Sequence, residues 1–324
     1  MHILKNNLEN KINKTLGFNC GKLTNSGSEA IKYCLINANV KKETLVVMPV
    51  TICKSVVDAV LDYGCYPYFV DVDTDFCLDL KMVQDTFRND ISTIIYIHAY
   101  GIYKNISELV KFCKERSIIL IEDSAQYINA RNIYVKVPQG DIIIYSFGKG
   151  KPIDVEKYGF IASNKMDIKY YPNIVENDKY SLLYDKFTDI KTIIDNKLQK
   201  VKLYKQLLNT NNIKDNDNFI DNIFHRILFY QPQNYNDISK KMYQFMDKNK
   251  LDNYQSTIFI EAFREPALQK KNPNVYQDLH LENFKIYEKL KKSYHYFRTC
   301  DWINEDNIKK ICDFFNKVLN DNST

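Results

Sequence analysis

The sequence predicts an α/β protein in which helices cover a mostly parallel central sheet and a smaller α+β domain follows toward the C-terminus. Two observations support this fold class. Short, continuously apolar segments alternate with helical segments over the first half of the chain, as in βαβ units around a buried parallel sheet. All nine glycines lie at or before Gly159, so the tight turns are concentrated in that half.

The first expected element is a helix over residues 4–16, because apolar residues recur at every fourth position from Leu4 to Leu16. We expect this helix to pack on the outside of the main domain or on a partner chain. A short strand or turn follows at Leu23, and a second helix begins near Ser28.

Alternating strands and helices make up the rest of the first half. In such sheets ligands gather at the carboxyl ends of the strands, which here are Pro49, His98, Glu122-Asp123 and Ser146. The expected strands are 44–48, 66–72, 92–97, 118–121, 142–145 and 160–162, and the expected helices are 55–63, 80–87 and 106–116.

The second half is rich in Lys, Asn, Asp and Tyr and contains no glycine beyond Gly159. Its pattern predicts a helical segment at 179–208, a polar loop at 209–218, a strand at 223–230 and helices at 237–248, 281–291 and 305–319. We therefore expect a large domain over residues 1–208, which holds the chemistry, and a small α+β domain over 209–324.

Composition and charge argue against several classes of protein. The chain has 45 basic and 40 acidic residues and no basic stripe interleaved with aromatic residues, so no nucleic-acid partner is expected. Residues 1–19 lack the apolar core of a signal peptide, and no segment is long and apolar enough to span a membrane. Eight cysteines without a C-x-x-C pair indicate a reduced, cytoplasmic protein, and five scattered histidines predict no metal site.

The segment Gly140–Lys151 (GDIIIYSFGKGK) combines a buried strand, a turn with two glycines and a lysine. Gly148 and Gly150 allow a tight turn and a close approach of the backbone. A partly desolvated amine at this place can attack an aldehyde cofactor. The alternative is that Lys151 is an ordinary solvated loop lysine.

Two further motifs precede this segment. Ser26-Gly27-Ser28 at the start of a helix can form an anion cup, although a plain serine N-cap with Glu29 in the first turn explains the same residues. Asp123 ends a buried strand, where a carboxylate is costly unless it meets a cation. It can serve a protonated pyridine nitrogen, with Gln126 over the same ring, or it can cap a helix.

With these motifs in this order, the chain resembles the DegT/DnrJ/EryC1/StrS family of sugar aminotransferases, which are pyridoxal-phosphate (PLP) enzymes of fold type I. The resemblance covers about residues 23–162. The matching segments are SGSEA at 26–30, VVMP at 46–49, YFVDVD at 68–73, HAYG at 98–101, EDSAQ at 122–126, and GD at 140–141 through SF at 146–147 to Lys151.

The resemblance implies a role for each matching residue. Lys151 matches the lysine that holds PLP as a Schiff base and then transfers protons. Asp123 matches the partner of the pyridine nitrogen, and Gln126 the residue beside the phenolic oxygen of the cofactor. Gly27, Ser28 and Ser146 match the contacts to the phosphate. The family also implies a homodimer with its site at the subunit interface.

Three departures from the family pattern affect substrate recognition. Cys53 stands where family members usually stack an aromatic residue on the ring, and sulfur packs there more weakly. The glycine-rich turn after the lysine is replaced by 152–158, and the Asn-x-Arg segment of the partner subunit has no counterpart at 164–206. Lys149 either replaces a missing cation near the phosphate or is a solvated loop residue.

Three functions follow from the resemblance. The first is a PLP-dependent aminotransferase that moves an amino group from glutamate to a keto sugar, most simply a nucleotide-linked one. The second is a PLP enzyme with a different reaction, such as sugar dehydration, or with a small phosphorylated ketone as acceptor. The third is a catalytically degenerate, non-enzymatic family member, against which the joint retention of Lys151, Asp123, Gln126 and Ser146 argues.

Overall fold

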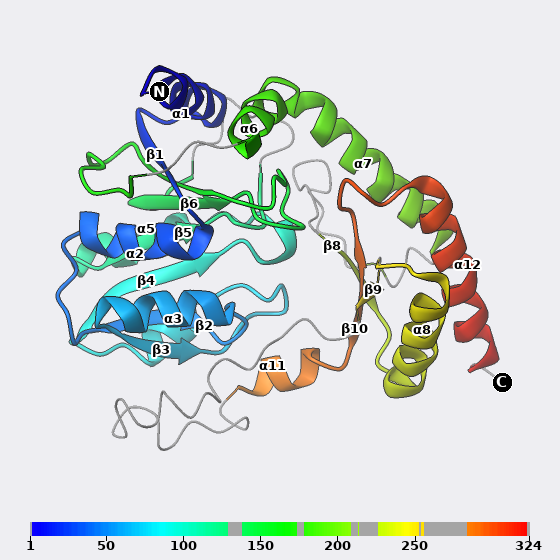
Figure 1. Ribbon diagram of the computed structural model, residues 1–324. Coiled ribbons are helices and arrows are strands. Elements are labelled where there is room, and N and C mark those ends of the chain that lie inside the picture. The colour runs from blue at the N-terminus through cyan, green and yellow to red at the C-terminus, as the bar shows by residue number, and fades with distance from the viewer. Residues whose placement is uncertain are drawn as a thin grey trace.

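A computed structural model describes residues 2–128, 138–173, 178–208, 213, 226–252, 254–255 and 284–322. A seven-stranded sheet forms its centre, with strand order β1-β7-β6-β5-β4-β2-β3 (Figure 1). β7 pairs antiparallel with both β1 and β6, and the other described strand pairs of this sheet are parallel. The strands are β1 (Cys20–Thr24), β2 (Leu45–Pro49), β3 (Tyr66–Val70), β4 (Ile91–Ile97), β5 (Ile119–Asp123), β6 (Ile142–Ser146) and β7 (Gly159–Ser163).

Helices cover the sheet because most residues of its strands are apolar and buried. In Figure 1, α2 (Gly27–Asn37) and α3 (Lys54–Tyr63) lie side by side in front of the sheet, and α5 (Ser107–Glu115) lies behind it. The short α4 (Leu80–Asp85) follows β3, and the 3-10 helix η1 (Ala99–Gly101) follows β4. The predicted α/β class with a mostly parallel sheet is confirmed.

The N-terminal helix α1 (His2–Leu16) packs on β1 and on α6 (Asp178–Thr188). Leu8 and Ile12 are fully buried in this contact. Glu9 is also buried; it pairs with Lys22 at 2.9 Å and accepts a hydrogen bond from the N–H of Leu23 at 3.1 Å. The expected packing of this helix on the main domain is therefore confirmed.

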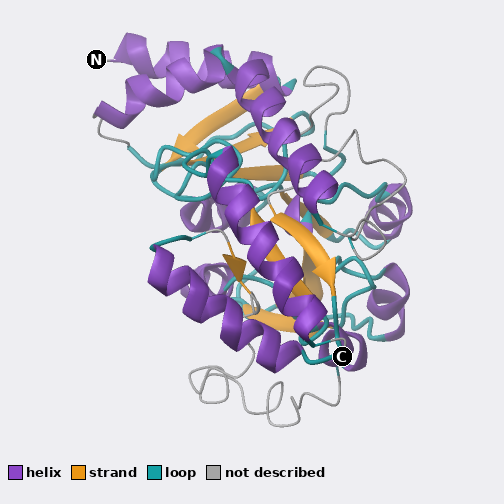
Figure 2. Cartoon of the chain, turned by 90° about the vertical axis from the view of Figure 1, so that its right-hand side faces the viewer, coloured by secondary structure: helices purple, strands orange, loops and turns teal. Residues whose placement is uncertain are grey.

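A second, antiparallel sheet of order β8-β10-β9 forms the centre of the C-terminal part. Its strands are β8 (Arg226–Tyr230), β9 (Tyr254–Gln255) and β10 (Tyr294–Arg298), and its helices are α8 (Tyr235–Asn249), α11 (Lys285–Leu290) and α12 (Glu305–Asp321). Figure 2 shows long helices lying over these strands on the side that faces the viewer. The described part of this region is thus α+β, as the sequence predicts.

Two expectations differ from the structure. The helical segment predicted at 179–208 is divided at Asp189 into α6 and α7 (Ile190–Leu207). The two helices bury apolar residues against different partners, α1 and α12, so one continuous periodicity hides the break. In addition, no strand is predicted at 294–298, although this aromatic-rich segment, YHYFR, is the middle strand of the small sheet.

The two sheets are tied together by side chains from the large sheet and from α7. Asp71, just past β3, accepts hydrogen bonds from the N–H groups of Ile286 and Tyr287 at 2.8 and 3.0 Å and so caps α11. Lys197 on α7 pairs with Asp301 at 2.8 Å. The boundary at residue 208 stays a prediction, since 209–212 lie outside the described residues.

Within the described residues, no helix combines the length and the apolar character that a bilayer span requires.

His295 on β10 gives the small sheet a predicted sensitivity to acid. Burial lowers the pKa of this imidazole to about 3, and the ring stacks on Tyr235 at 4.8 Å between centroids. The unfolded chain binds a proton on His295 near pH 6.5 and the folded chain does not, so the free energy of unfolding should fall as the pH drops from about 6.5 toward 3.

We expect His295→Phe to flatten this acid limb of the unfolding free energy, measured by urea denaturation between pH 7 and pH 4. Tyr254→Phe is the matched control: it removes the hydroxyl 2.5 Å from Nδ1 of His295 but keeps the imidazole, so the limb should remain. An unchanged slope in His295→Phe would contradict the assignment.

Candidate active site

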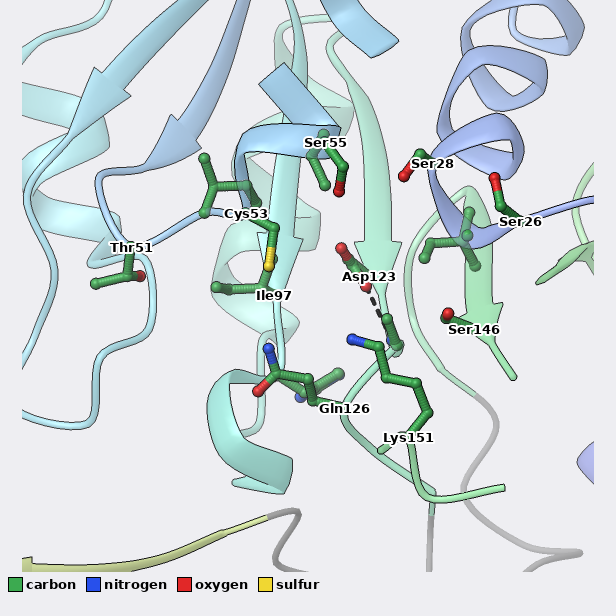
Figure 3. A pocket seen from close by; sticks show the side chains of 16 residues that line it. Ser26, Ser28, Thr51, Cys53, Ser55, Ile97, Asp123, Gln126, Ser146 and Lys151 are labelled. Atoms are coloured by element: carbon green, nitrogen blue, oxygen red, sulfur yellow. Dashed lines mark hydrogen bonds between the residues drawn. The ribbon is translucent and has the colours of Figure 1, made fainter. Parts of the chain in front are cut away.

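A pocket lies at the carboxyl ends of the parallel strands, where the sequence predicts the ligand site (Figure 3). We call it the strand-end pocket. All of the predicted site residues line it: Gly27, Ser28, Cys53, Asp123, Gln126, Ser146 and Lys151. Ser26, Thr51, Ile52, Ser55, Val56, Ile97, His98, Ala125 and Ile144 complete its wall. Segments up to 125 residues apart in the chain therefore meet in one place.

One side of the pocket is the first turn of α2. Ser26 caps this helix: its hydroxyl accepts a hydrogen bond from the N–H of Glu29 at 3.1 Å, and Glu29 Oε2 accepts one from the N–H of Asn25 at 2.7 Å. The plain N-cap explanation therefore holds for Ser26. It leaves Gly27 and Ser28 facing the pocket, where the first-turn N–H groups and the helix dipole favour an anion.

Gly27 has no room for a side chain. A Cβ atom there would lie 2.8 Å from Cβ of Ser146, so the helix start is seated directly against the end of β6. This contact places the hydroxyl of Ser146 beside the N-terminus of α2. Figure 3 shows Ser28 and Ser146 on the same side of the pocket.

Asp123 lies at the end of β5 and is 7% exposed. Its Oδ1 accepts a hydrogen bond from the N–H of Ala125 at 2.8 Å. Burial raises the pKa of this carboxyl, although the Ala125 hydrogen bond and the nearby Lys151 and His98 lower it in part. A buried carboxylate at this place is best stabilised by a cationic group bound in the pocket.

Lys151 is presented by the turn after β6. Gly150 has φ +78°, and its N–H donates to Asp154 Oδ2 at 2.7 Å, while the N–H of Lys151 donates to Gly148 at 3.2 Å. Figure 3 shows the amine of Lys151 directed toward Asp123. The sequence does not assign a role to Asp154, because it falls in the segment 152–158, where the family pattern is lost.

Lys149, two residues earlier, is exposed and is not among the residues that line the pocket. Its Nζ lies 6.0 Å from the ring centroid of Trp302. Of the two explanations for Lys149, the structure favours the solvated loop residue.

The amide of Gln126 is held in place by η1. Its Oε1 accepts a hydrogen bond from the N–H of Tyr100 at 2.9 Å. The amide nitrogen therefore points away from Tyr100, where it can donate a hydrogen bond to another group. Tyr100 has φ 58°, a strained left-handed conformation for a residue with a side chain.

His98 and Glu122 form a buried pair next to Asp123. The sequence predicts only that these two residues lie at strand ends and assigns them no role. His98 Nε2 lies 2.7 Å from Glu122 Oε1, and Glu122 Oε2 accepts hydrogen bonds from the N–H groups of Gln139 and Gly140, both at 2.7 Å. The pair thus joins β4 and β5 to the segment that leads into β6. The sequence feature that could have predicted this pair is the presence of a histidine and a glutamate at the ends of neighbouring strands.

Cys53 precedes α3 and is the exposed member of the eight cysteines; seven are buried or partly buried. Figure 3 shows its sulfur directed into the pocket. A thiol therefore occupies the place where the sequence comparison expects a flat aromatic face.

The pocket combines three chemical functions: an anion cup, a buried carboxylate and an amine. Within the described residues, no group of three or more histidine, cysteine, aspartate or glutamate side chains is arranged to hold a metal ion.

Comparison with known proteins gives the same family as the motifs. The model of the DegT/DnrJ/EryC1/StrS aminotransferase family matches residues 4–178. The GDP-perosamine synthase of Escherichia coli O157:H7 is 24% identical over 159 residues, which are 48% of this chain and 43% of that protein. The 3-oxo-glucose-6-phosphate:glutamate aminotransferase of Bacillus subtilis is 26% identical over 147 residues, which are 45% of this chain and 33% of that protein.

The chain thus spans less than half the length of these curated relatives in sequence. In structure the likeness extends further: the crystal structure of ntda from Bacillus subtilis, with bound cofactor PMP, has a TM-score of 0.74 at 19% identity and covers 97% of this chain and 77% of that one. The fold is that of the fold type I PLP enzymes. On the family match, which includes every predicted site residue, the chain belongs to the DegT/DnrJ/EryC1/StrS aminotransferase family.

Proposed function

We propose that this protein is a PLP-dependent aminotransferase. The observation that carries the proposal is the meeting of Lys151, Asp123 and the α2 anion cup in one pocket at the carboxyl edge of the sheet. Family membership supports it, since the family is one of aminotransferases.

PLP has four polar groups that need partners, and the pocket offers a partner for each. Its phosphate fits the N-terminus of α2 with Ser28 and Ser146, which the close contact between Gly27 and Ser146 holds side by side. Its protonated ring nitrogen fits the buried Asp123, and its aldehyde fits the amine of Lys151. Gln126 would donate to the phenolic oxygen, and Cys53 would contact a ring face.

Each of these pocket residues would have a separate role in the reaction. When bound, PLP supplies an electron sink for the carbanion at the substrate α-carbon. Lys151 Nζ would hold the cofactor covalently and would afterwards move the proton at the α-carbon. Asp123 would keep the ring nitrogen protonated, and the attraction would offset the cost of burying the charge of this carboxylate. The His98–Glu122 pair fixes the strand ends behind it.

For the substrates, we propose glutamate as amino donor and a nucleotide-linked keto sugar as acceptor. The E. coli relative is named for a GDP-linked sugar product, and the B. subtilis relative for glutamate and a phosphorylated keto sugar. Because the B. subtilis relative is named for a phosphorylated keto sugar, a small phosphorylated ketone is the alternative acceptor. We also propose a homodimer that acts in the cytoplasm; these two points are inferred from the family.

Lys151→Ala should remove the visible absorbance band that the wild-type protein gains on addition of PLP, because the covalent link requires the amine. Lys149→Ala is the matched control, since that lysine is exposed, lies over Trp302 and should leave the band unchanged. An absorbance titration with PLP measures both. A wild-type protein that stays colourless after addition of PLP would contradict the proposal and would favour a catalytically degenerate family member.

Asp123→Asn should retain the PLP band but slow its conversion to the amine form by glutamate, by about 100-fold or more, because the ring nitrogen loses its charged partner. Stopped-flow absorbance with glutamate alone measures this half-reaction. A normal rate in the variant would mean that Asp123 serves a structural purpose only.

Gly27→Ala should weaken the affinity for PLP by about tenfold or more, because the added methyl lies 2.8 Å from Cβ of Ser146 and displaces the helix start. Gly148→Ala is its control: a Cβ there meets only the Ser146 hydroxyl, at 3.5 Å, which is ordinary contact. Equal dissociation constants for the two variants would refute the role of this close approach.

A further inference from the structure

A second hollow of the surface lies beside the turn that carries Lys151, and it shares no lining residue with the strand-end pocket. Its volume is about 420 Å³, within the range of about 300 to 1,000 Å³ that small-molecule sites occupy. We call it the Trp302 groove. It is formed by residues 154–156 of the turn, by Lys179, Leu182 and Lys186 of α6, and by Asp301 and Trp302 between β10 and α12.

Trp302 gives the groove a flat aromatic surface. It is the only tryptophan of the chain, and 42% of its surface is exposed. One edge of the indole is seated on the turn after β6, because a Cβ atom on Gly150 would lie 3.6 Å from Cη2 of Trp302. Leu182 lines the same groove and is also exposed. Two large exposed apolar side chains in one hollow favour a ligand that has a flat, apolar ring.

Residues 154–156 belong to the segment in which the chain departs from the glycine-rich turn of its family. Asp154 holds this turn: its carboxylate accepts hydrogen bonds from the N–H groups of Gly150 and Glu156 at 2.7 and 2.8 Å. Glu156 Oε2 lies 2.9 Å from Nζ of Lys179 on α6. The departure from the family pattern thus builds part of the groove, so the family match does not predict a ligand there.

One face of α6 lines the groove. Lys179, Leu182 and Lys186 are spaced three and four residues apart, which places them on the same side of a helix. Nζ of Lys186 lies 2.7 Å from Oδ2 of Asp301, and the lysine side chain is partly exposed. A ligand in the groove can therefore reach this ammonium group.

The carboxylate of Asp301 is shared between two lysines. Nζ of Lys197, a buried residue of α7, lies 2.8 Å from its Oδ1. A third lysine, Lys200, donates to the backbone carbonyls of Cys300 and Asp301 at 2.8 and 3.2 Å. Figure 1 shows the segment between β10 and α12 passing beside α7, which carries both lysines. Burial and the charge of Lys197 lower the pKa of Lys200.

The end of the groove at Asp301 has an excess of positive charge. Lys186, Lys197 and Lys200 surround this one carboxylate, which leaves two positive charges in excess among these four residues. Elsewhere in the groove, Lys179 pairs with Glu156, and two backbone N–H groups stabilise the charge of Asp154. An anion with at least two negative charges would balance the Asp301 end.

We propose that the Trp302 groove binds a nucleoside diphosphate. Its base would stack on the indole of Trp302, and its diphosphate would pair with Lys186 and lie near Lys200. Stacking on an aromatic side chain is possible for every base. A nucleoside alone would leave the positive charge unbalanced, and pyrophosphate alone would leave the indole exposed, so a ligand with both groups fits the groove best.

Two kinds of molecule carry this chemical group. One is a free nucleoside diphosphate, which would act on the enzyme through the turn that carries Lys151. The other is a sugar nucleotide; in that case the inference rests on the proposed function, because the groove would hold the nucleotide part of the acceptor. The turn after β6 connects the two sites, since Lys151 lines the strand-end pocket and Asp154 lines the groove.

Tryptophan fluorescence reports on this groove directly, because the chain has one tryptophan. UDP and GDP should quench it with saturation, both in the PLP-loaded protein and in the protein without PLP. Uridine and pyrophosphate should each bind about tenfold more weakly or worse, because each lacks one of the two groups.

Lys186→Gln should raise the dissociation constant of UDP about tenfold and change that of uridine by no more than about twofold, because it removes a charge and keeps the stacking surface. Lys191→Gln is the matched control: this helical lysine also pairs with an aspartate, Asp195, at 2.7 Å, but it lies outside the groove and should change neither constant.

Trp302→Leu, measured by calorimetry, should raise the dissociation constants of UDP and GDP about tenfold or more. Tyr243→Leu, which removes an exposed aromatic ring of α8, is its control and should leave both constants unchanged. The melting temperature of each variant shows whether it is folded.

UDP-glucose distinguishes the two sources of the ligand. If the groove holds the nucleotide part of an acceptor, UDP-glucose should change the visible absorbance of the PLP-loaded protein, and Trp302→Leu should abolish this change. If the groove serves a free nucleoside diphosphate, UDP-glucose should leave the PLP absorbance unchanged while UDP still quenches the tryptophan.

Three results would overturn the inference: no saturable binding of UDP or GDP by fluorescence and by calorimetry, unchanged UDP binding in folded Trp302→Leu or Lys186→Gln protein, or pyrophosphate binding as tight as that of UDP. Each of them leaves the proposed function intact. A protein that binds UDP in this groove but stays colourless with PLP contradicts the proposed function and not this inference.

Discussion

The backbone contact between the start of α2 and the ends of β6 and β7 determines the geometry of the strand-end pocket. A Cβ atom on Gly159 would lie 2.5 Å from the carbonyl oxygen of Ser26, and one on Gly27 would lie 2.8 Å from Cβ of Ser146. The N–H of Tyr158 also donates to the carbonyl of Asn25 at 3.2 Å. The start of α2, which forms the anion cup, is therefore packed directly against both ends of the turn that carries Lys151. This packing fixes the distance between the anion cup and the turn.

The large sheet could be predicted from the sequence because its strands are buried on both faces. Most of them are short apolar runs, and the glycines and polar strand ends mark where the runs stop. The same logic locates the pocket, since strand ends of a parallel sheet meet at one edge. Lys151, Asp123 and Gly27 were thus predicted together with their common location; their chemical roles stay predictions.

The parts that escaped prediction depend on contacts between distant residues. Asp154 matters because its carboxylate accepts a hydrogen bond from Gly150 in a turn without any family motif. The break at Asp189 is invisible in the apolar periodicity, because both helices continue it. Hydrogen-bond partners and the direction of packing are properties of the folded chain, not of local sequence.

The capping of α11 by Asp71 has a consequence for the stability of this helix. A helix of six residues is too short to persist on its own, and its own N-cap residue, Phe284, offers no side-chain hydrogen bond. Its first N–H groups depend on a carboxylate more than 200 positions earlier in the chain. We therefore expect α11 to reach its full stability only when the chain around Asp71, just past β3, is folded, so the large sheet supports one helix of the C-terminal region.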